Sequence, residues 1–329
     1  MKKLLCLCLL IAAFALPAEA SVESALEECR SPEGILPEVP GRRTFSSDVV
    51  VQEMKLRLLQ GDRVRFDKLC AILVRYFQSP LTLLYTRLDS SLKPLAWENS
   101  TGVDLQACRV LLDAAVLWNE ESYHAKALKI AGRILRHNVY HDVLIDGATW
   151  KERVSQIYSI YEPSYFLNLS IVDVQLLLKL QSLMPRWEPV AQRSLGILLA
   201  GSGGEKPRQN YNVEKRHYTS TDVTSTEYMW MMVHLIDGGF VPLRSMDRLL
   251  ELIGGDPGAL VKSENASVAS AALAAYVLAR TGRHDLSRRT LEAMEAQFGS
   301  GGLLCDPGKP VSVFDNLLYL SIKEMLESR

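Results

Sequence analysis

Apolar residues recur at helical spacing along most of the chain, so that positions i, i+3, i+4 and i+7 share one face of each predicted helix. Eleven such segments, each 13 to 18 residues long, are found at 48–60, 66–78, 104–120, 122–139, 169–184, 187–201, 224–237, 242–254, 266–280, 285–298 and 314–328. The two-residue period of a strand is scarce, and only 141–150 and 313–320 are short strand candidates. The pattern therefore predicts an all-α protein.

The predicted helices come in pairs that repeat about every 50 residues, and roughly six pairs fill the chain. No tetratricopeptide-like signature recurs at a short fixed period, which disfavours an open solenoid. A closed toroid of helix hairpins fits the arrangement better. Such a toroid presents its loops at one end, where a cleft for an extended ligand can form.

Several predicted helices begin with residues that commonly cap a helix N-terminus, namely Asp48, Asp104, Ser122 and Asp285. The longest polar stretch between helices, at 201–222, also contains aromatic residues. Because long loops in compact domains are often functional, this stretch is a candidate part of a binding site.

Residues 1–20 have the organisation of a secretory signal peptide. Two lysines precede a short apolar run, and Ala-Glu-Ala at 18–20 matches a small-x-small cleavage site. The run is too short for a stable transmembrane span. We expect a bacterial protein that is periplasmic or secreted, with an N-terminal lead-in segment at 21–44 and a single domain at 45–329.

Four cysteines follow the predicted leader: Cys29, Cys70, Cys108 and Cys305. They are scattered and form no C-x-x-C pair, so a zinc cluster is not predicted, and we expect neither a metal nor another cofactor. Cys70 and Cys108 fall on apolar helix faces and are predicted to be buried thiols. For Cys29 and Cys305 two states remain open, free thiols or a bridge that joins the two ends of the chain.

The composition is that of an ordinary globular protein, 48% hydrophobic and 23% charged, so the chain can bury a large core. The formal net charge of −1 lacks the positive excess that nucleic acid or an anionic membrane surface attracts. We therefore expect neither as the main partner, and we expect a monomer.

Four sequence blocks follow one another along the chain: "GDRVRFD" at 61–67, "GVDLQ" at 102–106, "YEPSYF" at 161–166 and "VFDNLLYL" at 313–320. They resemble the blocks of glycoside hydrolase family 8, and in particular the periplasmic endoglucanases that accompany bacterial cellulose export. The resemblance covers about residues 45–320. It implies an (α/α)6 barrel that acts on a β-linked polysaccharide, such as a cellulose-like glucan or an exopolysaccharide.

The resemblance also implies roles for individual residues. Counting back from "GDRVRFD" places Asp48 on the general acid of the family, which is a Glu. Asp104 matches the second Asp of a Ser-Asp-x-Asp signature and would bind a sugar hydroxyl, whereas Gly102 stands in place of the first Asp. Tyr165 would lie beside the substrate, and Trp97 is a candidate platform on which a sugar ring stacks.

Each of these residues also has a structural interpretation. Asp48 and Asp104 have the sequence position of helix caps. Tyr165 follows a proline and would pack on the rim of the barrel, and a loop tryptophan such as Trp97 often fills a gap in the core.

The general base of the family lies in a Tyr-Asp-Ala-x-Arg motif at a helix start, and the corresponding block here reads "STDVTSTEYMW". An ungapped alignment places Val223 at the base position, directly after Asp222, and Thr226 stands near the expected Arg. Asp222 is therefore the predicted base. Glu227, one turn further along the helix, is the alternative.

Hydrolysis with inversion needs one protonated and one ionised carboxyl group, separated by roughly 6.5–9.5 Å so that a water molecule fits between them and the sugar. Asp48 and Asp222 are the pair that the sequence offers. The leading hypothesis is an exported, endo-acting inverting glycosidase. The alternative is a non-catalytic relative that binds a polysaccharide during exopolysaccharide production or export, and Gly102 and the missing Arg motivate it.

Overall fold

The computed structural model of the protein describes residues 21–150, 161–202, 208–219, 225–241, 243–253, 255–263 and 266–327. The α-helices are α2 (Val22–Glu28), α3 (Ser47–Leu59), α4 (Arg63–Ile72), α5 (Thr101–Trp118), α6 (Glu121–His137), α7 (Val174–Leu183), α8 (Glu188–Ser202), α9 (Ser225–Asp237), α10 (Leu243–Ile253), α11 (Pro257–Val261), α12 (Val268–Arg280), α13 (His284–Phe298) and α14 (Val313–Glu327). Short turns of other helix types are η1 (Leu73–Phe77), η2 (Leu169–Ile171) and η3 (Pro185–Trp187).

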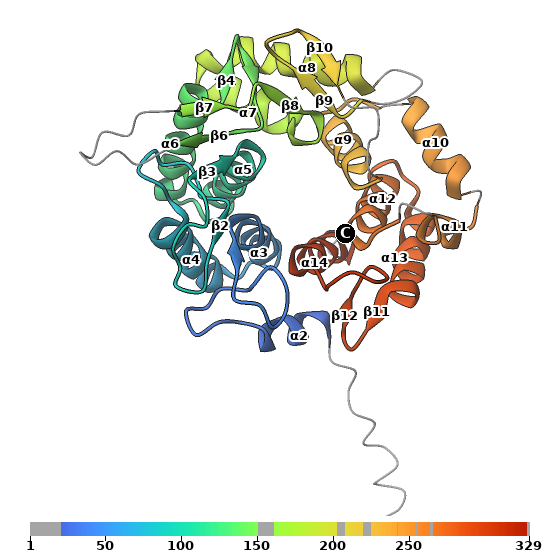
Figure 1. Cartoon of the computed structure of the whole chain (residues 1–329). Helices are drawn as coiled ribbons and strands as arrows, with labels where there is room; N and C mark the ends of the chain where they lie inside the picture. Colours follow the sequence, from blue (N-terminus) through green and yellow to red (C-terminus); the bar gives the residue numbers. More distant parts are fainter. Residues whose placement is uncertain are drawn as a thin grey trace, which may run out of the picture.

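Six helices form an inner ring in the order α3, α5, α7, α9, α12 and α14, and α14 packs against α3 to close it (Figure 1). The outer helices α4, α6, α8, α10, α11 and α13 surround this ring. The fold is the (α/α)6 barrel that the sequence predicts. α12 is buried nearly all round because α9, α13 and α14 pack against it, and its many alanines let these neighbours approach closely.

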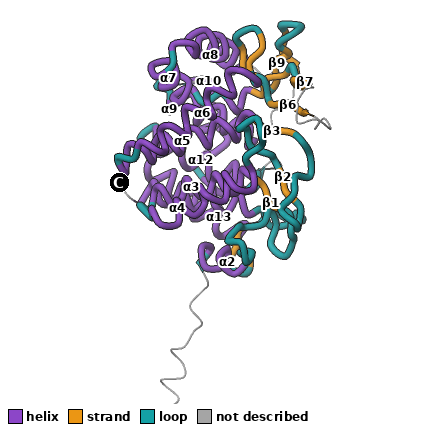
Figure 2. The backbone as a smooth tube through the Cα atoms, turned by 90° about the vertical axis from the view of Figure 1, so that its left-hand side faces the viewer, coloured by secondary structure: helices purple, strands orange, loops and turns teal. Residues whose placement is uncertain are grey.

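Short strands gather at one end of the barrel, as the side view shows (Figure 2). They are β1 (Phe45–Ser46), β2 (Arg87–Leu88), β3 (Glu98–Ser100), β4 (Val139–Tyr140), β5 (Val143–Leu144), β6 (Gly147–Trp150), β7 (Tyr161–Pro163), β8 (Phe166–Asn168), β9 (Asn210–Asn212), β10 (His217–Thr219), β11 (Gly299–Ser300) and β12 (Leu303–Leu304). Antiparallel pairing joins β1 to β2, β4 to β5 and β11 to β12. In the two three-stranded sheets, β6 pairs with both β3 and β7, and β9 pairs with both β8 and β10. Since β1, β3 and β8 run directly into α3, α5 and η2, the strands fix the N-terminal ends of inner helices.

The two predicted strand segments have different outcomes. The segment 141–150 contains β5 and β6 and is confirmed. The segment 313–320 is wrong as a strand, because it forms the first half of α14. Its buried residues Val313, Asn316 and Leu317 follow the spacing of a helix face, which packs against α3 and α12.

Most helix starts lie within one turn of the predicted ones, but α7 begins five residues later than predicted, because η2 occupies 169–171. β1 pairs with β2 and brings Ser46 to the N-cap position of α3, so that Asp48 lies inside the first turn. The other predicted caps, Asp104, Ser122 and Asp285, likewise lie one to three residues inside their helices. The cap interpretation is therefore wrong for all four.

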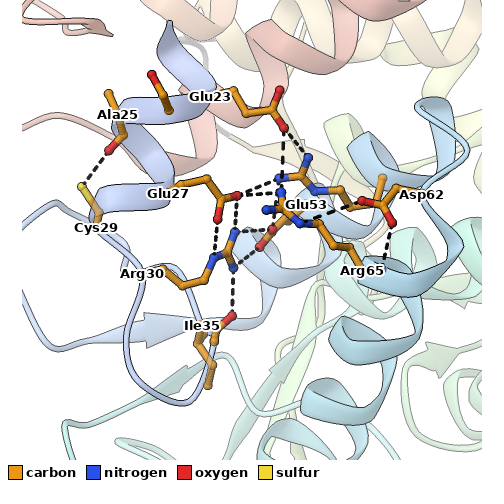
Figure 3. Close-up of polar contacts among 12 residues, drawn as sticks. Glu23, Ala25, Glu27, Cys29, Arg30, Ile35, Glu53, Asp62 and Arg65 are labelled. Carbon is orange, nitrogen blue, oxygen red and sulfur yellow. Dashed lines mark hydrogen bonds and ion pairs between the residues drawn. The ribbon is translucent and has the colours of Figure 1, made fainter. Parts of the chain in front are cut away.

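A buried ion-pair cluster attaches α2 to the ring (Figure 3). Arg57 of α3 is only 2% exposed, and its guanidinium lies 3.0 Å from Glu27 of α2 and 3.5 Å from Glu53 of α3, while it also pairs with Glu23 of α2. Arg30 follows α2 and lies 2.7 Å from Glu53. α2 also packs against α14, so residues that precede position 45 cover the junction between the first and last inner helices.

All four cysteines are free thiols in the structure. Cys70 and Cys108 are buried, as predicted. The Cys29 thiol donates to the carbonyl oxygen of Ala25 and the Cys305 thiol to that of Lys309, so the bridge between Cys29 and Cys305 is not formed. Within the described ranges, no helix combines the length and apolar character that crossing a membrane requires.

Candidate functional site

Four half-buried carboxyl groups lie where inner helices begin, at the end of the barrel that carries the strands. Asp48 and Asp315 are in the first turns of the adjacent helices α3 and α14. Glu227 is in the first turn of α9, and Asp146 lies between β5 and β6, where its carbonyl oxygen accepts from the N–H of Thr101 at the start of α5. The site is therefore built from helix N-termini, whose dipoles favour negative charge.

The Asp48 carboxyl has the environment that a general acid needs. Burial raises its pKa above the usual value, and the negative charge of Glu38 acts in the same direction. The Ser46 hydroxyl, the N–H of Val49 (2.8 Å from Oδ1) and the charge of Arg87 oppose this increase. The burial effect is the largest, so the protonated form of Asp48 persists to a higher pH than in a solvated aspartate.

Asp315 is a second acid beside Asp48. The pKa of Asp315 is raised to about 6, mainly by burial and also by the charges of Asp306 and Asp48, while a hydrogen bond with Ser312 opposes the increase. Because two neighbouring like charges disfavour each other, ionisation of one carboxyl holds the proton on the other.

Asn168, at the end of β8, connects two further carboxyl groups. Its backbone N–H donates to Asp146 Oδ1, and its side-chain amide donates to Glu227 Oε1 at 3.3 Å. The Gln209 amide donates to the same oxygen of Glu227. Burial, opposed by the Asn168 N–H and reinforced by the Glu227 charge, raises the pKa of Asp146 to about 6. This pair thus combines a carboxyl group held by two amides with a second carboxyl group, Asp146, that retains its proton up to about pH 6.

Asp104 occupies a different environment from the expected one. The residue is 0% exposed, and its carboxyl accepts from the N–H of Leu84 at 2.9 Å and from the Asn99 amide at 2.7 Å. Burial raises its pKa to about 7. In this conformation Asp104 is out of reach of a sugar, and it connects α5 to β3 and to the loop before β2.

Gly102, which stands where the resemblance places an acid, has no room for a side chain. A Cβ atom there would lie 2.9 Å from Cγ2 of Ile171 and 3.3 Å from its Cβ. Ile171 ends η2, so the space beside the α5 N-terminus is filled from the neighbouring helix pair. An aspartate at this position would require η2 to move.

The two aromatic candidates are half-buried at the strand end. Trp97 packs edge-on against Tyr85, with ring centroids 5.9 Å apart, and its carbonyl accepts from the N–H of Trp150. Tyr165 packs edge-on against Tyr140 at 5.1 Å and has a left-handed backbone with φ of 56°. A non-glycine residue in that region costs of the order of 1–3 kcal/mol and often marks a functional site.

Asp222 lies outside the described residues, so the distance between the predicted acid and base is not defined here. Within the 201–222 segment, the described stretch 208–219 contains β9 and β10, which extend the sheet from β8. Asp315 and Asp146 were missed as site residues, although both lie in segments that the sequence singled out as strands. Among the described residues, no cluster of three His, Cys, Asp or Glu side chains is arranged to hold a metal ion.

No protein-family model and no curated protein matches the chain. Solved structures do match it over almost its whole length. "A novel alpha-amylase from Clostridium perfringens" aligns with a TM-score of 0.81 and 18% identity, over 92% of this chain and 96% of the other. PssZ from Listeria monocytogenes aligns with a TM-score of 0.69 and 16% identity, over 92% and 94%.

The endoglucanase Cel10 from Klebsiella pneumoniae, a family 8 glycosyl hydrolase, aligns with a TM-score of 0.65 and 14% identity, over 94% of this chain and 99% of the other. At these identities the likeness is one of fold. The protein therefore has the (α/α)6 barrel of family 8 glycoside hydrolases, as the sequence blocks implied.

Proposed function

We propose that the protein is a glycosidase that cleaves a polysaccharide with inversion, and that Asp48 is its general acid. The observation that carries this proposal is the raised pKa of a half-buried carboxyl in the first turn of α3, where the sequence blocks place the acid of family 8. A general acid must hold its proton at the working pH and then release it to the leaving oxygen.

Asp222 is the proposed base, and Glu227 is the alternative. The sequence block "STDVTSTEYMW" is the support for Asp222, whereas α9, which carries Glu227 in its first turn, lies three positions from α3 in the inner ring. Glu227 has support of its own because the Asn168 and Gln209 amides hold its carboxylate. Trp97 and Tyr165 are the proposed contacts of the sugar rings.

The proposed substrate class is a β-linked glucan or exopolysaccharide, met outside the cytoplasm after the predicted leader at 1–20 is removed. The names of the similar structures include an endoglucanase and an alpha-amylase. The substrate panel must therefore include both linkage types.

The test is an assay of reducing ends released from β-1,4-glucan, mixed-linkage glucan, xylan, chitosan and soluble starch by the purified protein. The proposal predicts release from at least one β-linked polymer, with a newly formed anomer of inverted configuration by NMR. No release from any polymer would overturn it, and release from starch alone would overturn the β-linkage.

A non-catalytic polysaccharide-binding function is the second candidate. The observation that favours it is the Ile171 side chain, which fills the space beside Gly102. The sugar-binding acid that the resemblance places at position 102 is absent, and its side chain would not fit there. This candidate predicts that the protein and Asp48→Asn retain the same polysaccharide in affinity electrophoresis, and that neither releases reducing ends.

A further inference from the structure

A cavity of about 170 Å³ lies inside the ring, along the middle and C-terminal parts of inner helices and beside Asp173 at the N-cap of α7. Val51 and Gln52 of α3 line one part of it, and Leu58 and Leu59, the last residues of α3, line another together with Met325 near the end of α14. On α3, Gln52 stands one turn from Asp48 and donates to Ser321 of α14 at 2.9 Å. We call this cavity the basal pocket, and it is distinct from the carboxyl groups at the strand end.

The charges around the basal pocket are paired, with one exception. The three acids that line it each lie within 4 Å of a cation: Arg109–Asp173 at 2.7 Å, Arg109–Asp237 at 3.6 Å, Arg280–Asp237 at 3.4 Å and Lys179–Asp113 at 3.2 Å. Lys55 also lines the pocket, yet its ammonium group makes no hydrogen bond or ion pair with any described residue. Arg280 and Lys179 do not line the pocket, but together with Arg109 they pair with all three acids, so Lys55 is the lining cation without an ion-pair partner among the described residues.

The pKa of Lys55 supports this interpretation. The pKa of Lys55 is lowered to about 8, mainly by burial and secondly by the neighbouring charge of Arg109. Asp237, Asp173 and Asp113 act in the opposite direction but do not restore the usual value. An ammonium group that is stabilised this poorly by its own protein gains from an anion that enters the pocket.

The rest of the wall is mostly apolar. Trp230, Leu273, Leu318 and Ile322 line it, and the Trp230 ring stacks on that of His234 with centroids 5.5 Å apart. His234 is only 5% exposed, and its Nδ1 has no hydrogen-bond partner among the residues that the structure describes. An apolar cavity of about 150 Å³ is large enough to admit benzene, so the basal pocket has room for a six-membered ring.

We propose that the basal pocket binds a small organic carboxylate, which pairs with the Lys55 ammonium and packs its apolar body against Trp230. A cation is disfavoured because the acids are already paired. A polysaccharide is disfavoured by the size of the pocket. The proposal is independent of glycosidase activity, because Lys55 lies about 10 Å along the helix from Asp48 at 1.5 Å per residue.

Benzoate is the probe, and benzamide is its uncharged control of nearly the same shape. Isothermal titration calorimetry of the full chain at pH 7 is expected to show saturable binding of benzoate. Benzamide is expected to bind at least about tenfold more weakly. The affinity for benzoate should also fall as pH rises through about 8, because Lys55 then loses its proton. The other titratable or charged groups that line the pocket with Lys55 are Arg109, Asp113, Asp173, His234, Asp237 and Tyr276.

Lys55→Met should weaken benzoate binding by about tenfold or more. Lys129→Met, which changes an exposed lysine of the outer helix α6, should leave it unchanged. Circular dichroism melts check that both variants fold, and Lys55→Met is expected to fold because it removes an unpaired charge from an apolar wall.

A second measurement needs no variant. Acetylation of Lys55 in the wild-type protein, followed by mass spectrometry, should be slowed by benzoate and not by benzamide, with Lys129 unaffected. The proposal is overturned if benzoate shows no saturable binding, if benzamide binds equally well, or if Lys55→Met keeps the wild-type affinity.

Discussion

The surroundings of Asp48 in the structure change the role that its sequence position suggests. Alone it is an aspartate near a helix start, for which a capping role is the common one. In the structure Ser46 holds the cap position, and Asp48 lies among Glu38, Arg87 and Asp315, where burial shifts its pKa upward. Asp48 therefore does not serve as the helix cap, and its pKa is shifted in the direction that the proposed chemistry needs.

The proposed acid gives a pH prediction with a defined sign. The rate kcat/KM should fall at high pH as Asp48 loses its proton. Arg87→Gln removes a positive charge that lowers the Asp48 pKa and also frees Glu38, which lies 2.6 Å from Arg87 and raises that pKa. Both changes shift the alkaline limb of the pH–rate profile to higher pH. The expected shift is only roughly half a pH unit, because Arg87 is exposed to solvent. Arg193→Gln, on α8, is the matched control, and a downward movement for Arg87→Gln would contradict the assignment.

The base is identified by chemical rescue. Asp222→Ala and Glu227→Ala are compared for cleavage, and loss of the true base is expected to cost about 10²–10⁴-fold in rate. Sodium azide should restore turnover only in that variant, with a glycosyl azide as the product, because azide attacks without a base. Rescue of Glu227→Ala alone would transfer the role from Asp222 to Glu227, and rescue of neither variant would contradict both assignments.

At the scale of elements, the helices were predictable and their starts were not. The 3.6-residue period identifies segments such as 104–120. In the structure α5 already begins at Thr101, because β3 pairs with β6 up to Ser100 and the helix follows directly. Strands of two or three residues carry no readable alternation, so the sheet β8–β9–β10 was missed. The nearness of Asp146 to Glu227 depends on that region, which explains why the sequence did not predict it.

The role of Asp104 as a connection between elements is testable through stability. In Asp104→Asn, one acceptor oxygen becomes an N–H donor that faces the Leu84 N–H or the Asn99 amide, so one buried donor loses its acceptor. The expected loss is about 1–3 kcal/mol in the free energy of unfolding, measured by urea denaturation at low pH, below the folded pKa of Asp104 of about 7, where its contribution is still present.

The pH dependence of that stability has a defined sign. The pKa of Asp104 is raised to about 7 in the folded protein from 3.8, so its favourable contribution is complete below pH 4 and is lost as pH rises through 7. Asp104→Asn should therefore show a shallower decline of stability between pH 4 and 7 than the wild type. An equal slope would indicate that the folded carboxyl titrates normally.

The whole molecule is a ring that must close between its first and last inner helices. α14 packs on α3, α2 covers the junction, and the two segments that meet lie at opposite ends of the sequence. This closure brings Asp48 beside Asp315. The hairpin repeat predicts a toroid, but no local sequence pattern predicts which residues of the first and last inner helices contact each other.

The ion-pair cluster at this junction should matter to the stability of the ring. Arg57→Ala leaves Glu53, which is 2% exposed, with Arg30 as its remaining partner, and it breaks the connection to Glu23 and Glu27 of α2. A loss of about 3–5 kcal/mol is expected from urea denaturation. Arg63→Ala, which breaks an exposed pair with Glu120, is the control and should change the midpoint little. Equal effects of the two variants would contradict a structural role for the cluster.

The central claim is that this barrel cleaves a polysaccharide with Asp48 as the acid. The most direct measurement is the rate at which the wild type and Asp48→Asn release reducing ends from the best polymer of the panel, with binding of that polymer measured in parallel. The account predicts that Asp48→Asn binds as the wild type does and cleaves about 10²–10⁴-fold more slowly. Cleavage by Asp48→Asn at the wild-type rate, or no cleavage by the wild type, would contradict it.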